Sequence, residues 1–138
     1  MRRTFALVLL LACGCAEKPP PASPDTGAKD AAAAFFGGLI VGEPQRAYDL
    51  LDPESQRRVT PERFAQLAAA YSRNVGFTAE KVHFQTCEEQ GDSATARVVL
   101  IGRAPGHSRR YADGITLRRI DGRWRVVLPA NFGHRTRP

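Results

Sequence analysis

The sequence predicts an α+β fold, in which helices in the first half of the chain cover one face of an antiparallel sheet. Apolar side chains recur at helical spacing up to about residue 76, and beyond it they alternate with a period of two. Short turn signals separate the alternating segments, which is typical of strands that follow one another as a meander. Helices followed by a meander indicate the α+β class, and here only the helices are available to cover the apolar face of the sheet.

The first helix is expected to begin at Asp30, because a carboxylate can accept hydrogen bonds from the free amides of a helix N-terminus. The glycine pair at 37–38 weakens this helix but lets another backbone approach it closely. Gly42 is expected to end it. Pro44 suits the first position of a second helix, whose apolar residues run as far as Leu51.

The third main helix is expected after Thr60, since threonine is a good N-cap and Pro61 fits the first helical position. The sequence Asp-Pro-Glu at 52–54 predicts a turn or a short helix before it. Asn74 or Gly76 is expected to end the helix. Its apolar stripe consists of Phe64, Leu67, Ala68, Tyr71 and Val75.

The first strand is expected around Val82 and Phe84, with Thr86 as a further position on the same face. The sequence Gln-Gly-Asp at 90–92 predicts the turn into the second strand. Apolar residues occupy both faces of that strand toward Leu100, which favours a central place in the sheet.

The last two strands are expected to form a hairpin, because Asp121-Gly122 is the strongest hairpin signal in the chain. A two-residue turn at this point places Arg118 opposite Arg125 and Arg119 opposite Trp124. Trp124 is therefore expected to be buried against the helices, with the Arg119 guanidinium against its ring.

The first fifteen residues have the pattern of an export signal. Two arginines precede an apolar stretch over 5–12, which is too short to cross a membrane. The sequence Leu10-Leu11-Ala12-Cys13 resembles the processing box of bacterial lipoproteins. The resemblance implies that residues 1–12 are removed and that Cys13 carries a diacylglycerol and an acylated amino group. Cys15 is the alternative lipidation site, and a plain secretory signal with incidental cysteines is the alternative interpretation.

Residues 13–29 are rich in proline and lack apolar periodicity, so they are expected to form a tether between the lipid and a domain over 30–138. The lipoprotein resemblance implies a location in the cell envelope, facing the periplasm or the exterior. In a host with two membranes it implies the outer membrane, because Gly14 is not the aspartate linked to inner-membrane retention. Cys87 is expected to be a small buried residue rather than a metal ligand or a disulfide partner of Cys15.

Three motifs resemble the nuclear transport factor 2-like (cystatin-like) cone fold. One is the helix start over 60–64, and another is the closing strand over 121–126. The resemblance implies helices inside a curved sheet, and it specifies a fold rather than a function, because such domains include enzymes, small-molecule binders and lipoproteins of uncharacterised role. The third motif comprises Phe36, Leu39, Gly42, Glu43, Ala47, Tyr48, Leu50 and Leu51.

The charge of the chain is unevenly distributed along the sequence. The formal net charge is +6, and residues 97–138 contain ten arginines and two aspartates. An anion-binding face is therefore expected, formed by Arg97, Arg118, Arg123 and Arg125, with phospholipid or an acidic cell-wall polymer as partner. Nucleic acid is not an expected partner of an exported protein. The alternative interpretation is an ordinary solvated surface.

No catalytic set can be assigned from the sequence. Tyr48, Asp49, His83 and Asp113 are the candidates for a polar site inside the cone, but their strand and helix positions do not converge. His83 and Asp49 are expected to face solvent, and Asp113-Gly114 is expected to form a bulge or kink. No phosphate loop, metal motif or cofactor motif is present.

The sequence therefore predicts a membrane-anchored lipoprotein whose domain binds or scaffolds without catalysis. The alternative is a small-molecule-processing enzyme that uses polar residues inside the cone. The oligomeric state stays open, and a dimer is one option.

Replacing Cys13 by serine should abolish lipidation, because serine lacks the thiol that takes the diacylglycerol. Intact-mass analysis should show a lipid-sized addition on the wild-type protein and none on Cys13→Ser, which should also leave the membrane fraction or stay unprocessed. A wild-type mass without lipid would contradict the lipoprotein assignment. Loss of the lipid in Cys15→Ser alone would move the site to Cys15.

Overall fold

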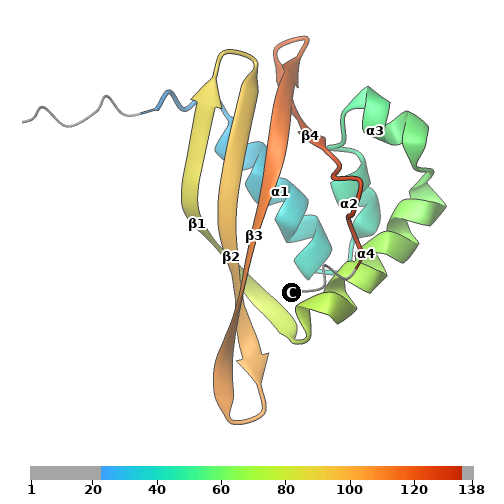
Figure 1. Cartoon of the computed structure of the whole chain (residues 1–138), viewed down its shortest axis with the longest axis vertical. Coiled ribbons are helices and arrows are strands. Elements are labelled where there is room, and N and C mark those ends of the chain that lie inside the picture. Colours follow the sequence, from blue (N-terminus) through green and yellow to red (C-terminus); the bar gives the residue numbers. More distant parts are fainter. Residues whose placement is uncertain (1–22, 135–138) are drawn as a thin grey trace, which may run out of the picture.

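Four helices pack against one face of a four-stranded antiparallel sheet (Figure 1), which confirms the predicted α+β class. The computed structural model describes residues 23–134, so the predicted signal, Cys13 and Cys15 lie outside the described residues. The helices are α1 (Ala28–Ile40), α2 (Pro44–Tyr48), α3 (Pro53–Arg58) and α4 (Pro61–Val75), and the strands are β1 (Thr78–Gln90), β2 (Ser93–Ala104), β3 (His107–Ile120) and β4 (Arg123–Val127).

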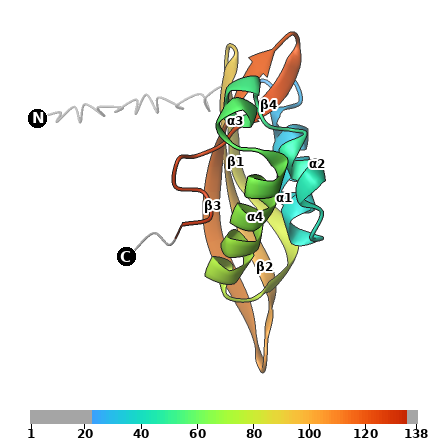
Figure 2. The same cartoon turned by 90° about the vertical axis from the view of Figure 1, so that its right-hand side faces the viewer.

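The strands pair in chain order, so β2 is central as expected. The sheet curves, and all four helices lie on one side of it (Figure 2). None of these helices, within the span from Ser23 to His134, is long and apolar enough to cross a membrane.

The predicted cap at Thr60 and the predicted proline start at Pro44 are confirmed, and Asp52 caps the short helix α3. Asp52 and Thr60 each accept a hydrogen bond from the backbone amide three residues later, at 2.9 and 3.2 Å. Pro44 stands at the start of α2, and Gly76 ends α4 in the left-handed conformation, with φ 79°. Close packing at the glycine pair involves Gly38 alone, where a Cβ atom would lie 3.1 Å from the Ala47 amide nitrogen.

The predicted start of α1 at Asp30 is wrong, because the helix begins two residues earlier. Its N-cap is Gly27, which has no side chain to accept hydrogen bonds. The Glu89 carboxylate of β1 takes that role, since it accepts from the amides of Thr26 (2.9 Å) and Ala28 (3.1 Å) and from the Thr26 hydroxyl (2.7 Å). A side chain sixty residues away therefore caps α1, and local sequence could not indicate it.

The predicted inward position of Thr86 is also wrong, because a β-bulge at Gln85 shifts the register of β1 against β2. Beyond the bulge, Thr86 faces solvent while Cys87 and Glu89 turn inward. Cys87 is a free thiol that is half-buried against the core rather than fully buried. Burial raises the pKa of this thiol, and the nearby Glu89 charge raises it further.

The β3–β4 hairpin has the predicted turn and register. Asp121 and Gly122 both have positive φ, at 51° and 73°, and Arg119 lies opposite Trp124. Trp124 is only 7% exposed, and its indole N–H donates to the Thr26 hydroxyl at 3.0 Å. The Arg119 guanidinium lies 5.5 Å from the centre of the Trp124 ring, so the expected cation–π contact is present.

The second helix is shorter than predicted, since α2 ends at Tyr48 and the chain then runs alongside β4. Leu51 forms a parallel bridge with Val126, whose amide donates to Leu50 and whose carbonyl accepts from Asp52. The segment 50–52 thus covers the edge of β4, which would otherwise present unpaired backbone groups.

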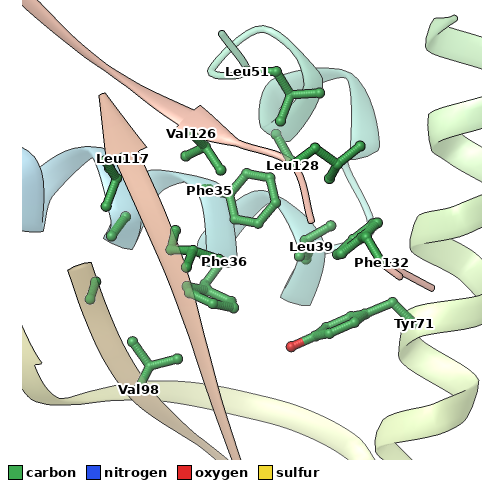
Figure 3. Packing of buried hydrophobic residues seen from close by; sticks show 14 of the residues in the cluster. Phe35, Phe36, Leu39, Leu51, Tyr71, Val98, Leu117, Val126, Leu128 and Phe132 are labelled. Atoms are coloured by element: carbon green, nitrogen blue, oxygen red, sulfur yellow. The ribbon is translucent and has the colours of Figure 1, made fainter. Parts of the chain in front are cut away.

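Aromatic rings fill the space between sheet and helices (Figure 3). Phe132, which follows β4, stacks on Phe64 with ring centres 5.6 Å apart and on Tyr71 at 5.2 Å. Phe35 lies 6.2 Å from Phe132 and completes the cluster. The end of the chain therefore closes the core between β3 and α4.

The Glu89 cap gives a pH-dependent prediction. Burial alone would raise the pKa of Glu89, but the hydrogen bonds from Thr26 and Ala28 and the charge of Arg119 hold that pKa below its ordinary value of 4.5. The stabilisation is therefore complete above pH 4.5 and is lost as the pH falls through the lowered pKa. Glu89→Gln should reduce the free energy of unfolding at pH 7 by about 1.5–3 kcal/mol.

The loss in Glu89→Gln should shrink as the pH approaches 3, because the wild-type carboxyl is then protonated as well. Urea denaturation at pH 7, 5 and 3.5 measures this difference. Glu88→Gln is the matched control, since Glu88 is the exposed neighbour on the other face of β1. Equal losses in the two variants at pH 7 would exclude the capping role of Glu89.

Candidate binding site

The four candidate arginines all lie on the outer face of the sheet, opposite the face that carries the buried core residues. Arg118 is directly opposite Arg125, and Arg123 lies two residues before Arg125 on β4. Arg97 on β2 is paired with Gly114 on β3. Gly114 lies four residues before Arg118 on the same strand, so Arg97 is about 13 Å from Arg118 along the strand direction. The hairpin therefore brings three of the arginines together and leaves Arg97 apart.

The facing pair Arg118 and Arg125 has partners that the sequence did not indicate. The Arg118 guanidinium lies 3.8 Å from the Glu54 carboxylate of α3, and Arg125 Nη1 donates to the Asp49 carbonyl at 2.8 Å. Both contacts are exposed, so each contributes little to stability. They partly relieve the repulsion that the facing register would otherwise create.

A groove of about 490 Å³ runs beside this pair, between the hairpin and the segment that joins α2 to α3. Asp121, Arg123 and Arg125 line the hairpin side, and Asp49 and Gln56 line the other. Arg123 has no acidic partner among residues 23–134. We call this set, Arg118, Arg123 and Arg125, the hairpin arginine cluster.

Of the four candidate interior residues, only Asp113 lies inside the cone. Its strand runs without a register shift at 113–114, so the predicted bulge is wrong. Packing is tight next to it, since a Cβ at Gly114 would lie 3.2 Å from the Ala96 carbonyl oxygen. His83 and Asp49 are exposed as expected, and the Tyr48 hydroxyl donates to the backbone carbonyl of Val59.

Asp113 forms a polar pair with Tyr71 that sequence reasoning missed. The Tyr71 hydroxyl donates to Asp113 Oδ2 at 2.6 Å, and the Gly114 amide donates to Oδ1 at 2.7 Å. Burial raises the pKa of Tyr71 far above its ordinary value, and the Asp113 charge raises it further. A cavity of about 100 Å³ lies beside the pair, with Tyr111 and His134 in its wall.

Every carboxylate that faces the interior in residues 23–134 is already hydrogen-bonded to the protein. Asp52 accepts from Ser55, Glu89 from Thr26 and Ala28, and Asp113 from Tyr71 and Gly114. No buried side-chain nitrogen or oxygen in this part of the chain lacks a partner. Within the same residues, no three His, Cys, Asp or Glu side chains gather as metal ligands would.

Solved structures resemble this arrangement closely enough to define the fold. An NTF2-like protein of Campylobacter jejuni, provisionally described as a transpeptidase, has a TM-score of 0.61 at 17% identity over 73% of this chain and 97% of that one. The fold is NTF2-like. A SEC-C motif protein of Rhodopseudomonas palustris has a TM-score of 0.51 at 14% identity, over 75% of this chain and 88% of its own.

Sequence comparisons add no relative, since no family model and no curated protein matches the chain. At 14–17% identity the structural likeness concerns the NTF2-like fold alone.

The Tyr71–Asp113 pair predicts unequal effects for two tyrosines of the same cluster. Tyr71→Phe should lower the free energy of unfolding by about 1.5–3 kcal/mol, because it removes a hydrogen bond to a charged acceptor. Tyr111→Phe is the control, since the Tyr111 hydroxyl has no protein hydrogen bond among residues 23–134, and its change should stay within about 0.5 kcal/mol. Urea denaturation at pH 7 measures both, and equal losses would contradict the pairing.

Proposed function

We propose that this protein is a lipid-anchored envelope lipoprotein whose NTF2-like domain is a non-catalytic binding or scaffolding module. In this proposal Cys13, or alternatively Cys15, carries the lipid. The predicted end of the tether at residue 29 is wrong, because Thr26 and Ala28 are hydrogen-bonded to Glu89 in the folded domain, so the tether ends before Ser23. The hairpin arginine cluster receives an anionic ligand at the membrane surface. In a host with two membranes, the surface is that of the outer membrane.

The satisfied interior is the single observation that carries the non-catalytic role. A general base needs a lone pair that can reach a substrate, and Asp52, Glu89 and Asp113 each already accept hydrogen bonds from protein donors that hold them in place. The cavity beside Asp113, at about 100 Å³, holds roughly three waters at the volume each has in the liquid. These facts support a module that binds on its outside.

The charge distribution supports an anionic partner. Three arginines project from one end of the outer sheet face, and within residues 23–134 only Arg118 has an ion pair there, with Glu54. Asp49 and Asp121 line the same groove as Arg123 and Arg125 without forming an ion pair with either. A phosphate group of a phospholipid, or a carboxylate of a cell-wall polymer, has the charge and acceptor geometry that guanidinium groups recognise. Arg97 would take part only through a ligand long enough to reach four residues further along the sheet.

An enzyme of this fold is the second candidate, and the Tyr71–Asp113 pair is the observation that favours it. A tyrosine and a carboxylate 2.6 Å apart inside a cone could transfer a proton to a bound molecule. The small cavity weighs against this role unless the segment 129–133, which lines it, moves aside.

Removal of the facing arginines tests the anionic partner. Arg118→Gln with Arg125→Gln should reduce co-sedimentation with phosphatidylglycerol vesicles and flatten its salt dependence, because two cations leave the surface. Stability should change by at most about 1 kcal/mol, since the lost contacts are exposed. The full chain carrying Cys13→Ser and Cys15→Ser serves as background, so that neither candidate cysteine can carry a lipid.

The matched control is Arg46→Gln with Arg63→Gln, which removes the same charge from the helical side. Phosphatidylcholine vesicles measure binding that does not depend on charge, and an acidic polysaccharide tests the cell-wall source. If the parent protein binds neither anionic material at low salt, or if the control pair weakens binding equally, the arginine cluster is ordinary solvated surface.

A further inference from the structure

An apolar cleft opens where α1 and α4 end and β1 begins. These ends lie far from the turn between β3 and β4 that carries the hairpin arginine cluster (Figure 1). The volume of the cleft is about 460 Å³, within the range of sites that hold small organic molecules. Gly76 ends α4 in the left-handed conformation, so the chain turns back there and β1 begins next to the end of α4. The lining side chains of the cleft include Leu39, Ile40, Tyr71, Arg73, Val75 and Phe77.

The walls of the cleft are apolar yet only partly covered. Ile40, Val75 and Phe77 are half-buried and pack against the core from its margin. Val41, which follows Ile40, is the large apolar residue with most exposure in residues 23–134, at 60%. Apolar side chains gathered at one open place are the feature that distinguishes a binding site from scattered surface residues.

Backbone packing fixes one wall of the cleft. A Cβ atom at Gly102 would lie 1.9 Å from the Thr78 carbonyl oxygen and 2.7 Å from Cδ2 of Phe77. Only glycine therefore lets the start of β1 lie this close to β2. The Phe77 ring rests on the Gly102 backbone, so this wall is formed by the fold and does not require a ligand to shape it.

One cation lines the cleft, and no carboxylate does. Arg73 lies in the last turn of α4, where a positive charge also favours the helix C-terminus. Its guanidinium has neither an ion pair nor a side-chain hydrogen bond with any residue from 23 to 134. Ser72 already donates its hydroxyl to the Ala68 carbonyl. The polar side chains left to meet a ligand are thus the Arg73 guanidinium and the Thr78 hydroxyl, and of these only Arg73 is charged.

We propose that this cleft binds a single-chain anionic amphiphile, with its acyl chain against Leu39, Ile40 and Phe77 and its acidic head group at Arg73. An apolar cavity with one unpaired guanidinium at its margin complements a molecule that is apolar along its length and negative at one end. A free fatty acid and the acyl chain of a phosphate-bearing lysolipid share this chemistry. The site is separate from the hairpin arginine cluster and does not depend on the proposed function.

Isothermal titration with three twelve-carbon probes tests the proposal, using the full chain with Cys13→Ser and Cys15→Ser, and concentrations below those at which the probes form micelles. Laurate and dodecyl phosphate represent the two sources of an anionic head, and dodecyltrimethylammonium carries the opposite charge. Laurate, dodecyl phosphate or both should bind at one site. The cation should bind at least about tenfold more weakly, as expected for loss of one charge-assisted contact.

Two variants separate the chain site from the head-group site. Ala79→Trp places a large ring in the cleft from β1, and it should abolish binding of all probes while urea denaturation shows a folded protein. Arg73→Gln should weaken the anionic probes about tenfold and should not weaken the cationic probe, whose repulsion by Arg73 it removes. Arg63→Gln, on the same helix but outside the cleft, is the matched control and should bind as the parent does.

The outcomes decide between occupants. If no probe binds, or if Ala79→Trp leaves binding unchanged, the cleft is not an amphiphile site. If Arg73→Gln and Arg63→Gln weaken binding equally, the head group does not lie at Arg73 and the proposal fails in that part. A further outcome would show that a second copy covers the cleft instead. In that case the parent protein is dimeric by light scattering and binds no probe, and Ala79→Trp is monomeric.

Discussion

The hydrogen bonds that Glu89 accepts join the two halves of this fold. α1 begins at a glycine without a capping side chain, so the amides at its N-terminus need an acceptor from elsewhere. Glu89 supplies it, and the same carboxylate orients the Thr26 hydroxyl that receives the indole N–H of Trp124. The cap of α1 and the hydrogen bond of the buried indole therefore depend on one side chain.

Glu89 faces inward only because of the bulge at Gln85. With an uninterrupted alternation from Val82, position 89 would lie on the solvent face, and α1 would lose its cap. The extra residue in β1 thus determines where the helical layer is attached. The cost of burying the carboxylate is offset by three donors and by the nearby Arg119 charge.

The sequence predicted the elements whose signals are local, and it failed where partners are remote. Thr60, Gly76 and the Asp121-Gly122 turn carry their own conformational signals, so α4 and the hairpin could be predicted with their ends. Alternation carries no information about a bulge, so the inward turn of Glu89 could not be predicted. At the candidate sites, the strand period placed Trp124 and the arginines on the correct faces, but Glu54 and Tyr71 reach Arg118 and Asp113 through tertiary packing alone.

Tyr71 divides the interior of the cone from the apolar cleft. Its ring stacks on Phe132 and its hydroxyl is held by Asp113, while the same residue lines the cleft beside Leu39. The backbone of Leu128, just after β4, is hydrogen-bonded to the side chains of Ser55 and Arg58 on α3. The chain that follows Leu128 then places Phe132 against Tyr71. The cleft is larger than the cavity beside Asp113, and Tyr71, whose hydroxyl donates to Asp113, forms part of its wall. A molecule entering from the ends of α1 and α4 would therefore meet a preformed apolar wall and would not reach Asp113, which separates binding in the cleft from any proton transfer inside the cone.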